Sequence, residues 1–180
     1  MVALWPIPAS AVGDVDDRPA LKAVLEHFAT RSDAHFYDQS AILAINPKTQ
    51  ETRGRDSDYQ YLNQGEGNCG IPESLYLSLR KRNATAIAAT KLAGKSPLWR
   101  VVSAEEAKVI NPAWPPPMGK KREPVKTLVT LTKPGYSADG NSALVNLSFV
   151  WSIHGAEARY LLRREGSNWK VTCSQLIFYV

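Results

Sequence analysis

The side chain with the clearest chemical potential in this chain is the thiol of Cys69. It lies in the run Gly67-Asn68-Cys69-Gly70, directly before a predicted helix start at Pro72-Glu73. The positive end of a helix dipole lowers the pKa of a thiol because it favours the thiolate. A nucleophilic thiolate also needs a base, and His154, next to Gly155 in a predicted turn, is an available imidazole. One hypothesis is therefore a small cysteine-dependent enzyme that uses Cys69 with His154 as base.

The competing interpretation of Cys69 is structural. The chain has two cysteines, Cys69 and Cys173, and a pair suits one disulfide in an oxidising compartment. No sequence spacing ties Cys69 to a histidine, so an unreactive buried thiol is a further alternative. We therefore assign no catalytic residue and keep the cysteine enzyme as the alternative hypothesis. No metal site and no cofactor are predicted, because the histidines, cysteines and acids show no recognised ligand spacing.

A proline-rich stretch carries the predicted binding residues. Residues 111–124 contain five prolines, which remove backbone donors and exclude regular secondary structure. Trp114 stands among these prolines, and Lys120, Lys121 and Arg122 follow. A stiff, extended loop with an aromatic and a basic part suits docking into a partner groove or onto an anionic surface. The sequence therefore predicts a binding surface at Trp114, Lys120, Lys121 and Arg122.

Composition excludes some classes of partner. The 22 Lys and Arg residues against 17 Asp and Glu give a net charge of +5, but the basic residues are spread along the chain. Only Trp114 neighbours a basic cluster, whereas proteins that grip single strands interleave several aromatics with basic residues. We therefore predict no nucleic-acid partner. No apolar run approaches the ~20 residues needed to cross a bilayer, so no membrane span is predicted.

The N-terminus indicates export. Ala9-Ser10-Ala11 has the small-x-small form of a signal-peptidase site, although the basic region and most of the apolar region of a leader are missing. Residues 1–15 are predicted to be a leader remnant or a disordered arm, and residues 16–180 a single domain. Together with the cysteine pair, this pattern predicts a periplasmic or secreted protein.

Three helices are expected in the first two thirds of the chain. Apolar side chains follow helical spacing from Leu21 to Phe28, after a start at Asp16-Asp17-Arg18-Pro19, which predicts a helix of about three turns. A second helix is predicted from Pro72-Glu73 to Arg82-Asn83, with cations at its negative end. Ser103-Ala104-Glu105-Glu106 has the capping-box spacing of a brief third helix.

The strands gather in the last third. The apolar run 40–45 predicts a buried strand, and 98–102 a short one. Alternation from Ala143 to Trp151 places five apolar side chains on one face of a strand. Short turns separate four predicted strands, which suits an antiparallel meander whose order follows the chain: residues 125–131, 142–152, 158–164 and 169–179. The predicted fold class is α+β, with N-terminal helices packed on a curved, mainly antiparallel sheet that ends in this meander.

These motifs together resemble a group of uncharacterised, mostly exported bacterial proteins. Ile71-Pro72-Glu73-Ser74-Leu75 opens the helix that ends in Arg82-Asn83, the run from Tyr136 to Val145 matches a Y-S-x-D-G-x-x-A-L-V meander, and Trp169-Lys170-Val171 lies in the closing strand. The resemblance implies export and the helix-then-meander order, and it carries no catalytic motif. The order also resembles the cone-shaped nuclear-transport-factor-like fold, which implies a pocket or a homodimer face on the curved sheet.

The leading functional hypothesis is a non-catalytic extracytoplasmic binding protein. Either the curved sheet or the proline-rich loop is expected to engage a small ligand or another protein. One concrete version is an inhibitor or immunity protein that blocks an enzyme.

Overall fold

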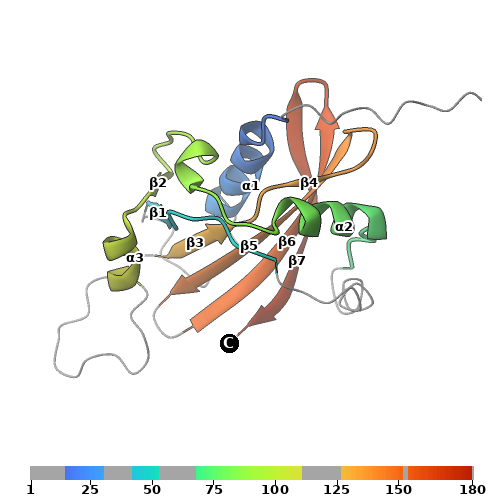
Figure 1. The fold of residues 1–180 in the computed structure, drawn as a ribbon. Coiled ribbons are helices and arrows are strands. Elements are labelled where there is room, and N and C mark those ends of the chain that lie inside the picture. Colours follow the sequence, from blue (N-terminus) through green and yellow to red (C-terminus); the bar gives the residue numbers. More distant parts are fainter. Residues whose placement is uncertain (1–14, 31–41, 53–67, 111–126, 152–153, 180) are drawn as a thin grey trace, which may run out of the picture.

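The computed structural model describes residues 15–30, 42–52, 68–110, 127–151 and 154–179. Within these residues three helices pack against one mixed sheet of seven strands, which confirms the predicted α+β class (Figure 1). None of the described helices is long and apolar enough to cross a membrane.

The helices fall where their sequence signals lie. They are α1 (Arg18–Thr30), α2 (Glu73–Arg82) and α3 (Ala104–Ile110). α1 buries its apolar stripe, and α2 buries Leu75, Tyr76 and Leu79. At the start of α3, Ser103 Oγ accepts a hydrogen bond from the backbone N–H of Glu106 at 3.0 Å, as the capping-box spacing predicts.

The sheet has strand order β2-β1-β3-β5-β6-β7, with β4 paired to β5. Its strands are β1 (Leu43–Ile45), β2 (Trp99–Val101), β3 (Leu128–Leu131), β4 (Gly135–Tyr136), β5 (Ser142–Trp151), β6 (His154–Glu165) and β7 (Asn168–Tyr179). The antiparallel succession β3-β5-β6-β7 is the predicted four-strand meander. β1 instead pairs in parallel with both β2 and β3, which makes the sheet mixed.

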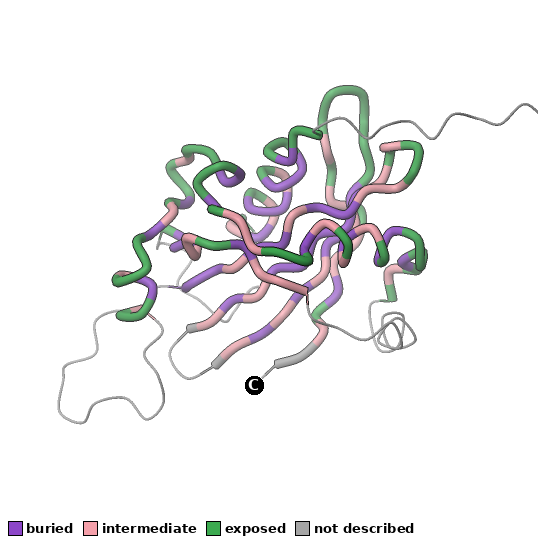
Figure 2. Tube along the Cα trace, in the orientation of Figure 1, coloured by how far each residue is buried: buried purple, intermediate pink, exposed green. Residues whose placement is uncertain are grey.

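One face of the sheet, the α1 face, holds the main core. Alternate residues of β5 from Ala143 to Phe149 point to it, and Phe149 packs on Phe28 of α1 with ring centres 4.9 Å apart. Figure 2 shows buried positions concentrated where α1 meets the strands, while the turn between β6 and β7 is exposed. The predicted inward alternation of β5 is confirmed for Ala143, Val145, Leu147 and Phe149.

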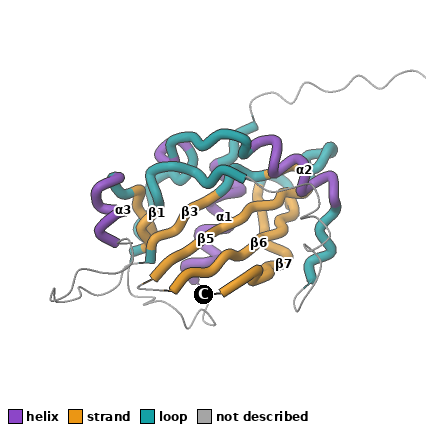
Figure 3. Tube along the Cα trace, turned by 60° about the horizontal axis from the view of Figure 1, so that its bottom comes forward, coloured by secondary structure: helices purple, strands orange, loops and turns teal. Residues whose placement is uncertain are grey.

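The opposite face, the α2–α3 face, holds two smaller cores. Leu144 of β5 packs with Leu75 and Leu79 under α2. Leu128 of β3 packs with Ala107 of α3 and Ala44 of β1. Figure 3 shows α2 and α3 at two ends of this face, with β3, β5, β6 and β7 running between them. In the described residues, the stretch of sheet between the two cores has no helix of its own.

The connection between β3 and β5 was expected to be a short turn, but it contains a further strand. Gly135 and Tyr136 form the short strand β4, which pairs with Leu144 and Ala143 of β5. The reason is packing, because α2 crosses β4 so closely that a Cβ on Gly135 would lie 2.3 Å from the backbone nitrogen of Leu79. In the turn between β4 and β5, Gly140 has φ +69°, a value that favours glycine.

Gly135→Ala should therefore lower the free energy of unfolding by about 3 kcal/mol, because backbone rather than a movable side chain occupies the space of the new methyl group. Urea unfolding measures the loss. Gly155→Ala is the matched control, since its Cβ would meet the Val150 methyl Cγ1 at 3.3 Å and that side chain can shift. Equal, small losses for both variants would contradict the close approach of α2 to β4.

A buried asparagine links the end of α2 to the chain between β3 and β4. Asn83 has no exposed surface, and its Nδ2 donates to the carbonyl oxygens of Leu79 and Lys133, both at 2.8 Å. Its Oδ1 accepts from the backbone N–H of Lys133 at 2.7 Å. One side chain therefore satisfies both backbone groups of Lys133 and ends the helix.

Candidate functional site

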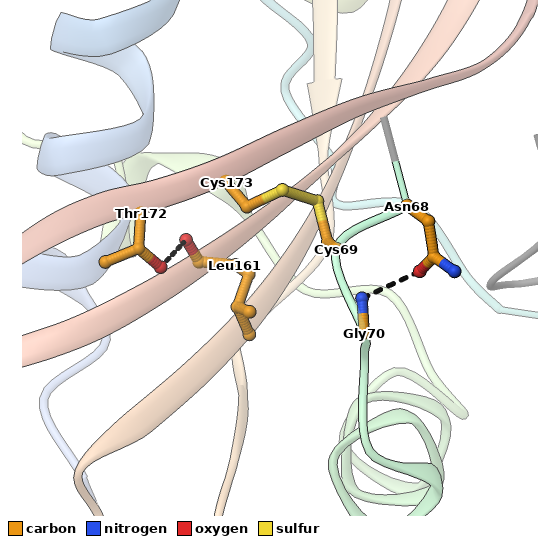
Figure 4. The surroundings of a disulfide bond; sticks show 6 residues. All are labelled: Asn68, Cys69, Gly70, Leu161, Thr172 and Cys173. Atoms are coloured by element: carbon orange, nitrogen blue, oxygen red, sulfur yellow. Dashed lines mark hydrogen bonds between the residues drawn. A yellow bond between two sulfur atoms is a disulfide. The ribbon is translucent and has the colours of Figure 1, made fainter. Parts of the chain in front are cut away.

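Cys69 and Cys173 form a disulfide in the structure, with their Cα atoms 5.7 Å apart (Figure 4). Cys173 lies on β7 opposite Leu161 of β6, and Cys69 lies just before α2. Next to Cys69, the Asn68 side chain accepts a hydrogen bond from the N–H of Gly70 at 2.8 Å. The bond ties the entry of α2 to the last strand of the sheet.

The structure does not bring Cys69 and His154 together. The sulfur of Cys69 is bonded to Cys173, so in this form it is no nucleophile. His154 is the first residue of β6, whereas the disulfide lies beside Leu161, well along the same strand. At ~3.3 Å per strand residue the two positions are roughly 20 Å apart, beyond any hydrogen bond. The geometry does not support the cysteine-dependent alternative.

The predicted binding residues of the proline-rich loop, Trp114, Lys120, Lys121 and Arg122, lie outside the described residues. The predicted leader or arm, residues 1–15, also lies outside them except for Val15.

Between the two small cores, the α2–α3 face carries a line of polar side chains that we call the polar row. Asn146 and Ser148 contribute from β5, and their cross-strand neighbours Arg159 and Glu157 contribute from β6. Gln175 of β7 lies beside Arg159. Gln50, which follows β1, donates its backbone N–H to Leu131 of β3 and completes the set. The row is thus Gln50, Asn146, Ser148, Glu157, Arg159 and Gln175.

Asn146 and Gln175 of the polar row are buried, and the other four side chains are half-buried. Asn146 is 6% exposed, and its Nδ2 donates to Glu157 Oε1 at 3.0 Å. Gln50 also hydrogen-bonds this carboxylate, while its Oε1 accepts from Ser148 Oγ at 2.8 Å. The amide oxygen of Asn146 has no hydrogen-bond partner. Buried polar atoms are nearly always paired, so this atom is a vacant acceptor in a prepared polar environment.

The carboxyl group of Glu157 is the titratable centre of the row. Burial raises its pKa above the ordinary value, and Arg159, Asn146 and Gln50 offset part of this effect by favouring the charged form. A partly buried carboxyl with a raised pKa beside a vacant acceptor is a common property of functional sites. The row can therefore accept hydrogen bonds or a proton from a bound molecule.

An open hollow of about 710 Å³ lies beside α3 on the same side of the sheet. Leu128 of β3 belongs to its lining, and Leu128 pairs with Val150, two residues along β5 from Ser148 of the polar row. Ala107 and Lys108 of α3 form one wall, and residues 46–48 and 86–88 form another. Glu51, next to Gln50, also lines the hollow, so the hollow and the row adjoin.

A second buried polar cluster has a different character. Arg82 Nη2 donates to both carboxylate oxygens of Asp17, at 2.7 and 2.9 Å, and the Tyr136 hydroxyl donates to the same group at 3.1 Å. The Arg82 guanidinium also lies 5.1 Å from the centre of the Tyr136 ring. Burial raises the pKa of Asp17, and Arg82 and Tyr136 partly oppose this. Because Arg82 of α2 and Tyr136 of β4 both bind Asp17, which directly precedes α1, we interpret the cluster as a structural link.

Sequence reasoning missed both polar clusters. The sequence does contain a signal for the polar row. Asn146 and Ser148 alternate with apolar residues in β5, and Glu157 and Arg159 alternate with apolar residues in β6. Such alternation usually marks a solvated face. The cross-strand register brings these side chains together, and Gln50 packs against them, so that they are at least half-buried.

Comparisons with known proteins give no match: no family model, no curated protein and no solved structure matches this chain. The resemblance to exported bacterial proteins and to the nuclear-transport-factor-like fold thus stays a prediction. Among the described residues, no group of three or more His, Cys, Asp or Glu side chains is placed to hold a metal ion.

Proposed function

We propose that this protein is a non-catalytic binding protein that works outside the cytoplasm and binds its ligand on the α2–α3 face. The observation that carries the proposal is the vacant acceptor of the polar row, the Asn146 amide oxygen, in a residue only 6% exposed and bonded to Glu157. Folding alone gives no reason to bury such an atom unpaired, since an apolar residue of similar size avoids the penalty.

Two further features support the proposal. The hollow beside α3 adjoins the row and falls within the size range of small-molecule sites. The Cys69–Cys173 bond suits an oxidising compartment, in agreement with the predicted export. A ligand on this face needs no reactive thiol. An inhibitor or immunity protein is the version of this function in which the ligand is another protein.

Glu157→Gln tests whether the row is kept for binding or for stability. The pKa of Glu157 lies above its ordinary value of 4.5, so the folded protein keeps this proton at pH values where the unfolded chain has lost it. The stability of the wild type therefore falls as pH rises from about 4.5 through the folded pKa. The glutamine variant has no such proton. It should be more stable than the wild type at pH 7, and the difference should shrink toward pH 4, as measured by urea unfolding.

Glu165→Gln is the matched control. Glu165 is exposed at the end of β6 and pairs with Lys170 at 3.6 Å, so its substitution should change stability by less than about 0.5 kcal/mol at either pH. Loss of stability in Glu157→Gln at pH 7 would show that the carboxylate is a structural member of the sheet, and the proposal would lose its main support.

A further inference from the structure

We propose that the hollow beside α3 binds an organic anion, a molecule with an apolar body and one carboxylate or sulfonate group. The inference rests on the proposed function, because it assigns a ligand class to one end of the α2–α3 face.

The apolar part of the lining combines four alanines with the larger side chains of Pro47, Ile87 and Leu128. Ala104 and Ala107 contribute from α3, and residues 86–88 contribute from the opposite wall. Leu128 of β3 lies between these walls. Because alanines fill little space, the hollow keeps a volume of about 710 Å³, enough for a flat or narrow apolar body of drug-like size. An apolar portion of a ligand would bury its surface against these residues and gain free energy by leaving water.

The charged part of the lining selects the sign of the ligand. Lys48 and Lys108 stand on the two walls, and no carboxylate in the described part of the chain forms an ion pair with either. Glu51, the one carboxylate of the lining, has interactions of its own. Two lysines in the lining of one hollow attract an anion and repel a cation of the same shape.

The acidic residues near the hollow do not cancel the positive charge of its two lysines. In the first turn of α3, Glu106 is paired with Arg100, and Glu105 is not among the residues that line the hollow. Asn46 uses its side-chain oxygen to accept a hydrogen bond from the backbone N–H of Lys48 at 3.1 Å, which fixes the turn that carries this lysine. Lys48 and Lys108 are both exposed to solvent and both belong to the lining of the hollow.

The test uses anilinonaphthalene sulfonate (ANS), an anionic aromatic probe whose fluorescence rises on leaving water. The native protein should bind ANS saturably, and binding should weaken as salt shortens the ~8 Å screening length of physiological solution. Octanoate should displace the probe, whereas octylammonium, with the same chain and the opposite charge, should not. The double variant Lys48→Glu/Lys108→Glu should weaken ANS binding at least about tenfold.

Lys91→Glu/Lys95→Glu is the matched control, because it makes the same change of net charge at exposed lysines outside the lining. It should alter ANS binding less than about twofold. Equal effects of the two double variants would place the probe elsewhere and overturn the inference. Displacement by octylammonium as well as octanoate would overturn the anionic class. Neither result depends on the unfolding stability of Glu157→Gln. Failure of the inference and failure of the proposed function are therefore distinguishable.

Discussion

Removing the disulfide with C69S/C173S should lower the free energy of unfolding by about 4 kcal/mol. The bond joins residues separated by 104 positions, and a cross-link across such a long segment strongly restricts the unfolded chain. It also holds the start of α2 against β7. Without the bond, the core that Leu75 and Leu79 form under α2 is less firmly held to the sheet. Urea unfolding without reductant measures the effect.

The single variants C69S and C173S separate the cross-link from local packing. Either substitution breaks the same bond, so each should lose nearly as much stability as the double variant, and the effects should not add. Reduced wild-type protein should behave like the variants. A loss below about 1 kcal/mol in all of these, the size of an ordinary surface change, would mean that the cysteines do not hold α2 to the sheet.

Asn83→Ala should cost about 4 kcal/mol, the other large effect that we expect. The substitution removes three hydrogen bonds of a fully buried side chain and leaves the N–H and C=O of Lys133 without that partner. Each buried polar group left unpaired costs about 1–3 kcal/mol. Asn83→Leu, which restores the volume but no hydrogen bond, should be comparably destabilised in thermal and urea unfolding.

Asn141→Ala is the control for Asn83. Asn141 is exposed, and its side chain bonds only Asp139 of the same turn at 3.2 Å, so we expect a loss below about 1 kcal/mol. If Asn83→Leu keeps wild-type stability, the volume of Asn83 matters and its hydrogen bonds do not.

The helices and the strands of the meander could be predicted because each depends on residues that are close together in the sequence. The helical spacing from Leu21 to Phe28 and the alternation from Ala143 to Phe149 each need only neighbouring residues and a buried face. The meander follows from short turns, which leave little choice of strand order. The parallel pairing of β1 with β2 and β3 could not be predicted, because three-residue strands joined through distant segments leave no periodic signal.

The site was less predictable than the fold. Cys69 and Cys173 are far apart in the chain, so the sequence favoured a disulfide or an unreactive thiol over a nucleophile but did not show the bond, which depends on tertiary structure. Asn83 carries the signal of a helix end, but its bonds to Lys133 depend on where the chain returns after β3. The burial of Asn146 likewise depends on tertiary contacts, not on its own strand.

The central claim is that the α2–α3 face is the binding surface, and mapping by NMR tests it most directly. ¹⁵N-labelled protein is titrated with octanoate, and the backbone amide and tryptophan indole signals are followed. We predict saturable shifts centred on Ala107, Leu128 and the neighbouring residues of β3 and β5, with the residues of α1 unchanged. Shifts centred on α1 or on the Trp114 indole would contradict the account, and no saturable shift at all would overturn the anionic ligand class.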